Sequence, residues 1–231
     1  MNILVTGGSK GIGKAIADNL EGNIYTCGRN EELLKSYKNY CICDLATIEG
    51  MQKLGDYIEA NKIDILINNA GEYIYSPIEE IGVNQIEHIT RLNLEAPLYL
   101  ISRAVPYMKT QKWGRIINIG SISGVLGEAG ASLYSASKSG LIGASKALAL
   151  ELAEYGITIN TINPGWVDTE MGSSSAAESE FSKEEIIDCI PQKRFVHPDE
   201  IAGMVKYLIS KEAKGVTGQS INLCAGLTCG Y

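Results

Sequence analysis

Short apolar runs alternate with longer segments of helical periodicity along the 231 residues of this chain. The apolar runs carry hydrophobic residues on both faces, which indicates strands of a parallel sheet covered by helices on both sides. The predicted strands are Asn2–Thr6, Ile24–Cys27, Tyr40–Cys43, Asp64–Ile67, Arg115–Ile119, Thr158–Ile162 and Ser220–Leu223. The predicted helices are Gly11–Leu20, Glu31–Tyr37, Thr47–Ala60, Gln85–Met108, Ala136–Ala153 and Pro198–Ile209.

No Pro- or Ser-rich linker divides this pattern. We therefore predict an α/β fold over residues 1–231: one Rossmann-type, doubly wound parallel sheet of about seven strands with helices on both faces. Gly172–Ser182 departs from the pattern because it is small, polar and poor in large apolar residues. We expect this stretch to belong to a substrate lid within residues 166–190.

The charge balance excludes several classes of partner. A net charge of −7 and a pI near 5.0 disfavour a nucleic-acid surface, which needs clustered Lys and Arg. No apolar stretch reaches the roughly 18 residues of a membrane span, and the first residues lack a signal-peptide pattern. The six cysteines match neither a CxxC pair nor a zinc ribbon, so no metal site is predicted. We expect a cytoplasmic protein with neither a nucleic acid nor a membrane as partner.

A glycine-rich segment, TGGSKGIG at residues 6–13, joins the first predicted strand to the first predicted helix. Glycines at such a turn let the backbone approach a pyrophosphate, and the helix N-terminus offers free N–H groups to the phosphates. After the second strand the chain continues with Gly28, Arg29 and Asn30, where an NAD site would carry a carboxylate. Arg29, with Lys10 in the glycine segment, suits a 2′-phosphate, so NADP(H) is the predicted cofactor.

Further motifs follow in order along the chain. Asp44-Leu45 follows the third strand, NNAG occupies residues 68–71, YSASK occupies residues 134–138, and NPGWVDT occupies residues 163–169. Together with the glycine segment, this ordered set resembles the short-chain dehydrogenase/reductase family over nearly the whole chain. Within that family the chain is most similar to 3-oxoacyl-acyl-carrier-protein reductases. The resemblance implies a cofactor site made of Gly7, Ser9, Lys10, Gly11, Ile12, Gly13, Arg29, Asp44, Leu45, Asn69, Ala70, Gly71, Tyr134, Lys138, Pro164, Gly165, Val167 and Thr169.

The reacting end has a chemistry that the residues themselves suggest. A ketone that accepts hydride develops negative charge on its oxygen, so the site must supply a proton and a fixed hydrogen bond. Tyr134 can supply the proton, and Lys138 lies four residues later on the same helical face, where its charge would lower the pKa of the phenol toward neutrality. The resemblance implies that Lys138 also holds the nicotinamide ribose, that Ser121 binds the substrate oxygen and that Asn93 supports a proton relay.

We therefore predict an NADPH-dependent oxidoreductase that reduces a ketone to a secondary alcohol, or runs the reverse reaction. A hydrolase is disfavoured because Gly120–Gly124 places neither serine at the centre of a GxSxG motif. A catalytically silent NADP-binding scaffold or sensor remains an alternative, as does a carrier-bound 3-oxoacyl substrate. Residues 116–137 and 166–182 contain no Lys or Arg, which favours a small ketone over one held by an acidic carrier. The resemblance implies a homotetramer or homodimer.

Overall fold

Seven parallel strands form one sheet in the order β3-β2-β1-β4-β5-β6-β7. The structure is a computed structural model, and it describes residues 1–172, 174 and 182–229. The strands are β1 (Asn2–Thr6), β2 (Asn23–Gly28), β3 (Asn39–Ile42), β4 (Ile65–Asn68), β5 (Gly114–Ile119), β6 (Ile157–Pro164) and β7 (Ser220–Leu223). The predicted fold class is confirmed, and the strand order reverses between β1 and β4, which is where such sheets bind ligands.

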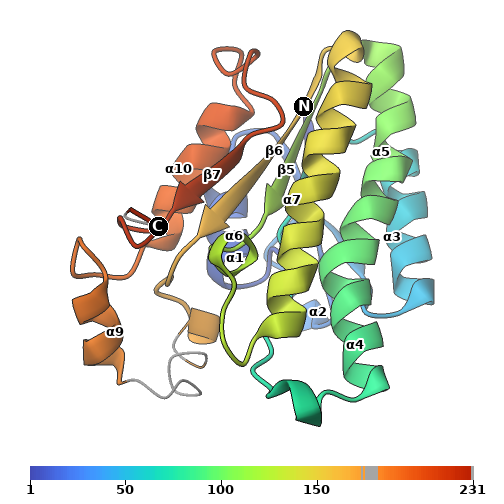
Figure 1. Cartoon of the computed structure of the whole chain (residues 1–231). Coiled ribbons are helices and arrows are strands. Elements are labelled where there is room, and N and C mark those ends of the chain that lie inside the picture. The colour runs from blue at the N-terminus through green and yellow to red at the C-terminus, as the bar shows by residue number, and fades with distance from the viewer. Residues whose placement is uncertain (173, 175–181, 230–231) are drawn as a thin grey trace.

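Helices cover both faces of the sheet (Figure 1). Their bounds are α1 (Gly11–Asn19), α2 (Glu31–Leu34), α3 (Ile48–Asn61), α4 (Val83–Thr90), α5 (Ala96–Gln111), α6 (Ser123–Leu126), α7 (Ser132–Leu152), α9 (Lys183–Cys189) and α10 (Pro198–Leu208). The 3₁₀ and π-helical turns are η1 (Ile78–Glu80), η2 (Arg91–Glu95) and η3 (Ala153–Tyr155). Within the described ranges, no helix is both long and apolar enough to cross a membrane.

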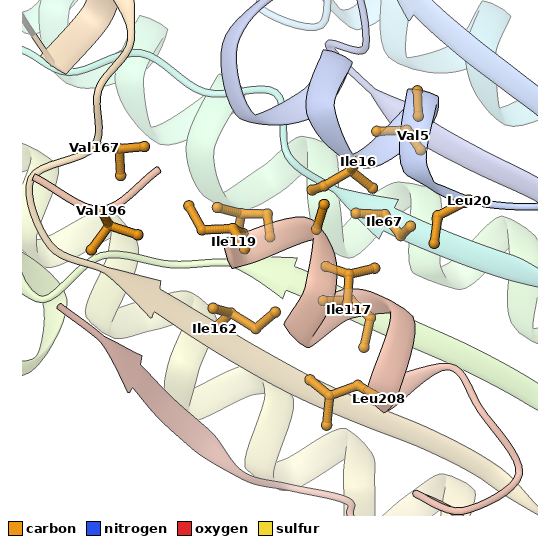
Figure 2. Packing of buried hydrophobic residues seen from close by; sticks show 14 of the residues in the cluster. Val5, Ile16, Leu20, Ile67, Ile117, Ile119, Ile162, Val167, Val196 and Leu208 are labelled. Atoms are coloured by element: carbon orange, nitrogen blue, oxygen red, sulfur yellow. The ribbon is translucent and has the colours of Figure 1, made fainter. Parts of the chain in front are cut away.

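Two hydrophobic cores lie on opposite faces of the sheet, because successive side chains of each strand alternate between the faces. Val5 and Ile67 belong to one core together with Ile16 of α1 and Leu208 of α10 (Figure 2). Leu4, the neighbour of Val5, instead joins the core that faces α3, α5 and α7. Both faces of the inner strands are therefore buried, as the unbroken apolar runs of the sequence indicate.

The prediction of one continuous helix over Gln85–Met108 is wrong, because the structure divides this stretch into α4, η2 and α5. η2 is a π-helical turn in which the N–H of Ala96 donates to the carbonyl of Arg91, five residues earlier. Such turns are frequent at functional sites, and this one carries Asn93. A π turn adds one residue to the helix. The spacing of the apolar residues changes too little for the sequence to reveal this insertion.

A buried polar chain links the centre of the sheet to α7. The amide of Asn68 donates to Asn118 at 2.8 Å, and Asn118 in turn donates to the hydroxyl of Ser145 at 2.9 Å. Thr161 also donates to Ser145 at 2.9 Å, while Ser145 donates to the carbonyl of Leu141 at 2.8 Å. Ser145 therefore accepts two hydrogen bonds in a region closed to water, which fixes α7 against β5 and β6.

We expect Ser145→Ala to lower the free energy of unfolding by about 2 kcal/mol, because Asn118 and Thr161 would each lose a buried acceptor. Urea unfolding followed by circular dichroism measures this loss. Ser102→Ala is the matched control, since Ser102 is an exposed helical serine whose hydroxyl donates to the nearby carbonyl of Tyr99. The control should change stability by less than about 0.5 kcal/mol. Equal effects of the two variants would contradict the assigned role of Ser145.

Candidate active site

A cavity of about 920 Å³ opens where the carboxyl ends of the strands meet. Its lining includes every residue predicted to hold the cofactor, and three of the four predicted catalytic residues: Ser121, Tyr134 and Lys138. Asn93, the fourth, does not line it. The sheet thus brings together residues from well-separated segments of the sequence, because parallel strands end at one common edge.

The glycine segment meets the geometric demands of a phosphate site. Gly7 adopts φ +64°, which L side chains rarely allow. A Cβ on Gly13 would lie only 2.3 Å from the carbonyl oxygen of Gly7, so α1 can start this close to the turn only with glycine there. α1 also begins without a capping side chain and without an acidic residue in its first turn. Its first N–H groups are therefore available to an anion.

The hydroxyl of Thr6 ties the two loops beside the switch point together. Thr6 is buried, and its Oγ1 accepts hydrogen bonds from the backbone N–H groups of Asn69 and Ala70, both at 2.9 Å. The side chain of Asn69 donates back to the carbonyl of Thr6 at 2.9 Å. The glycine segment and the NNAG loop therefore form one rigid wall. Thr6 begins the glycine segment, yet the sequence predicted no role for its side chain.

Two cations lie at the end of the cavity reached from β2. Arg29 follows β2, is exposed and makes no ion pair with any residue that the structure describes. Lys10 pairs with Glu170 at 2.8 Å across the cavity mouth, so a ligand must share this cation or displace the carboxylate. Asp44 accepts a hydrogen bond from the N–H of Ala46 at 3.0 Å, which fixes its carboxylate at the cavity wall.

Tyr134 and Lys138 lie one helical turn apart on α7. The Lys138 ammonium is 5.6 Å from the centroid of the Tyr134 ring and donates to the carbonyl of Ile119 at 2.9 Å. Lys138 is 4% exposed, and this burial lowers its pKa to about 8. The lysine therefore still carries its charge at neutral pH but loses it in mildly alkaline solution.

The pKa of Tyr134 moves opposite to our expectation. Burial raises the pKa of the phenol to about 12, a hydrogen bond with Ser121 partly offsets this, and the nearby Glu128 carboxylate adds to the rise. The physical reason is that desolvation penalises the phenolate more than its surroundings stabilise it. Tyr134 is therefore a protonated acid at neutral pH.

Asn93 lies behind the cavity wall. It is 1% exposed, its Oδ1 accepts from the N–H of Glu72 at 3.0 Å, and its Nδ2 donates to the carbonyl of Glu72 at 2.9 Å. The same Nδ2 also donates to Ser137 at 3.3 Å. Asn93 thus fixes the backbone that follows Gly71 against α7, next to Lys138.

Several cavity residues were not predicted from the sequence. Tyr73, Ser123 and Glu128 line the substrate end beside Tyr134, but they belong to none of the sequence motifs. The only signal available was their position, within a few residues of NNAG and of Ser121. Among the described residues, no group of three or more His, Cys, Asp or Glu side chains is arranged to hold a metal ion.

Comparisons with known proteins agree with this geometry. The family model "short chain dehydrogenase" matches residues 1–180, and the chain belongs to the short-chain dehydrogenase/reductase family of oxidoreductases. The 3-oxoacyl-acyl-carrier-protein reductase FabG of Rickettsia bellii is 38% identical, over 97% of this chain and 95% of its own. Nodulation protein G of Azospirillum brasilense is 37% identical, over 97% of this chain and 96% of its own.

A solved structure resembles the chain over nearly its full length. It is an actinorhodin polyketide ketoreductase variant crystallised with NADPH, with a TM-score of 0.92 and 34% identity, and the match covers 99% of this chain and 97% of that one. The family predicted from the ordered motifs is therefore confirmed.

We expect the buried charge of Lys138 to leave a signature in the pH dependence of stability. Folding lowers its pKa from 10.5 to about 8, so the unfolded chain binds more protons between these values and stability rises with pH across that window. Relative to Lys138→Met, the wild-type free energy of unfolding should rise by about 2 kcal/mol from pH ~7.5 to pH ~10. Urea unfolding at several pH values measures this difference.

Lys146→Met removes an exposed lysine from the same helix and serves as the control. If the difference from wild type changed with pH equally in both variants, burial of Lys138 would not be its cause.

Proposed function

We propose that this chain is an NADPH-dependent oxidoreductase that reduces a ketone to a secondary alcohol, or runs the reverse reaction. The observation that carries the proposal is the continuity of the cavity. The uncapped start of α1 and the Arg29 guanidinium lie at one end, and Tyr134, Ser121 and Lys138 lie at the other. An extended dinucleotide could reach from one end of this cavity to the other, which would place its reactive ring beside Tyr134.

The residues present fit the cofactor. The glycine segment and the first turn of α1 would hold the pyrophosphate, and Pro164, Gly165, Val167 and Thr169 would border the nicotinamide. Lys138 would hold the nicotinamide ribose, as the family resemblance implies. When bound, NADPH supplies the hydride that the carbonyl carbon accepts.

The protein supplies the proton. Ser121 would donate a hydrogen bond to the carbonyl oxygen and hold it near the phenol of Tyr134. Since the pKa of Tyr134 is about 12, the phenol is protonated at neutral pH and can transfer its proton to the oxygen as the C–H bond forms. The ammonium of Lys138 would stabilise the phenolate left behind until solvent returns a proton. A raised phenol pKa favours the reducing direction at neutral pH.

The last residue of β2 and the two residues that follow it account for the proposed preference for NADPH over NADH. Gly28, Arg29 and Asn30 contain no carboxylate to receive a ribose 2′-hydroxyl, and the Asn30 side chain instead accepts from the N–H of Glu32 to begin α2. Arg29 is left to contact a 2′-phosphate. The actinorhodin ketoreductase variant was crystallised with NADPH, which is in keeping with this preference.

A small ketone is favoured over a carrier-bound one, although the reductase of R. bellii supports 3-oxoacyl-acyl-carrier-protein reduction as a second candidate. An acidic carrier needs available cations at the entrance. Lys193 already pairs with Asp188, and Arg194 pairs with Glu200 at 2.6 Å. A silent NADP-binding scaffold is disfavoured because the serine, tyrosine and lysine are all retained in one cavity.

The proposal also includes a substrate lid and an assembly of several copies of the chain. Residues 166–190 would act as the substrate lid, of which residues 173 and 175–181 lie outside the described ranges. Trp166, at its start, stacks on Phe195 with ring centroids 5.8 Å apart, which anchors that end. The chain would assemble as a homotetramer or homodimer, as the family resemblance implies.

Arg29→Ala should weaken NADPH binding about ten- to a hundredfold and leave NADH binding nearly unchanged, because only NADPH carries the 2′-phosphate. Fluorescence titration of both nucleotides measures this. Lys35→Ala, which removes a nearby cation outside the cavity lining, should leave both affinities unchanged. Equal loss of both nucleotides in Arg29→Ala would contradict the assignment.

Tyr134→Phe should lower the turnover rate with an accepted ketone by at least about a hundredfold, because the variant lacks the proton donor. The loss of NADPH affinity should be much smaller than the loss of turnover. Stopped-flow or steady-state loss of NADPH absorbance across a ketone panel gives the rate, and Tyr207→Phe, an exposed tyrosine of α10, is the control. A Tyr134→Phe enzyme as fast as wild type would disprove the proposed chemistry.

A further inference from the structure

The carboxylate of Glu128 is held against the substrate end of the cavity by two hydrogen bonds. The hydroxyl of Tyr73 donates to its Oε1 at 2.8 Å, and the hydroxyl of Ser123 donates to its Oε2 at 2.6 Å. Both carboxylate oxygens are therefore fixed. Such short bonds to an ionised acceptor are stronger than bonds between neutral groups.

This carboxylate is connected to the catalytic end on two sides. The Ser121 hydroxyl donates to the Ser123 hydroxyl at 3.1 Å, and the Ser123 hydroxyl in turn donates to the carboxylate of Glu128. On the other side, the ring of Tyr73 contacts the ring of Tyr134 edge to face, with centroids 5.1 Å apart. Glu128 also raises the pKa of Tyr134 through its charge. The carboxylate therefore lies within electrostatic reach of the reacting atoms.

The backbone around Glu128 is also constrained. Gly127 and Gly130 adopt φ +79° and +72°, and the N–H of Ala131 donates to the Glu128 carbonyl at 3.1 Å, which closes a tight turn. The N–H of Ser76 donates to the Gly130 carbonyl at 2.7 Å and joins this turn to the segment that carries Tyr73. The position of the carboxylate is thus fixed by both its side-chain and its backbone contacts.

No cation among the described residues neutralises this carboxylate. Glu128 makes no ion pair with them, whereas Glu170 of the lining pairs with Lys10, and Glu72 contacts the imidazole of His88. Residues 116–137 and 166–172, which border this end of the cavity, contain no Lys or Arg. The cations of the described cavity lining are Lys10, Arg29 and Lys138, of which only Lys138 lies at this end.

We propose that Glu128 determines which ketones the site accepts, by rejecting those with a carboxylate or phosphate beside the carbonyl and favouring neutral ones. The inference rests on the proposed ketone reduction and adds a substrate class to it. A fixed carboxylate within about 6 Å of a second negative charge in a partly desolvated site lowers binding by a factor of about ten to a hundred. Ketones with hydroxyl or amine donors near the carbonyl gain a hydrogen bond instead.

A matched pair of ketones tests this proposal. Acetoacetate and acetoacetamide have the same size and differ in whether a carboxylate or a neutral amide follows the ketone. Wild type with NADPH should have a kcat/KM for the amide at least about tenfold above that for the anion. Glu128→Gln keeps the shape and one of the two hydrogen-bond acceptors and removes the charge, so this ratio should fall at least about tenfold, mainly through a lower KM for acetoacetate.

Glu80→Gln is the control, because it removes the same charge from an exposed position outside the cavity lining. NADPH affinity and the melting temperature of each variant establish that it is folded. Glu80→Gln and wild type should have the same ratio of kcat/KM for acetoacetamide to kcat/KM for acetoacetate.

The outcomes separate this inference from the proposed function. If Glu128→Gln lowered kcat for both ketones equally and kept the ratio, Glu128 would only position Ser121 through Ser123, and the specificity role would be wrong. An equal shift of the ratio in Glu80→Gln would assign the effect to overall charge and also overturn it. If wild type bound NADPH but reduced neither ketone, the proposed function itself would fail, and the inference with it.

Discussion

Every part of this site depends on the parallel direction of the strands. Because parallel strands end at one edge, the loops after β1, β2, β4, β5 and β6 meet there although the chain between them spans most of the sequence. The buried hydroxyl of Thr6 then holds two of these loops together, through the N–H groups of Asn69 and Ala70. This contact lies where the strand order reverses, so it holds the glycine segment and the NNAG loop in one position relative to each other.

Burial sets the protonation states of Tyr134 and Lys138. It shifts the pKa of Lys138 down to about 8 and the pKa of Tyr134 up to about 12, in each case toward the neutral form. At neutral pH the site therefore holds a protonated phenol beside a lysine that is still charged. In the proposed reaction the unfavourable phenolate forms only during turnover, when the ammonium is in place to stabilise it. A low-dielectric site of this kind makes each fixed charge, including that of Glu128, more influential.

The same cavity is electrostatically divided. Lys10 and Arg29 lie where a nucleotide phosphate would bind, whereas Glu72 and Glu128 lie near the reacting end. The relatives are similar to this chain over nearly its whole length, but function is decided by the particular residues of a site and not by the fold that carries them. In this chain the hydrogen bonds of Tyr73 and Ser123 fix the carboxylate of Glu128 in the cavity lining beside Tyr134, where we propose that it selects the substrate.

The sequence by itself determined the α/β class, the seven strands and the family, because apolar period and glycine placement are local properties of the chain. The motifs also predicted most of the cofactor end of the cavity lining. Only the tertiary structure decided the rest. The π turn that buries Asn93, the pairing of Lys10 with Glu170 and the upward shift of the Tyr134 pKa all depend on contacts between distant segments. Glu128 acquires its position from Tyr73, 55 residues away along the chain, and no local pattern encodes such a contact.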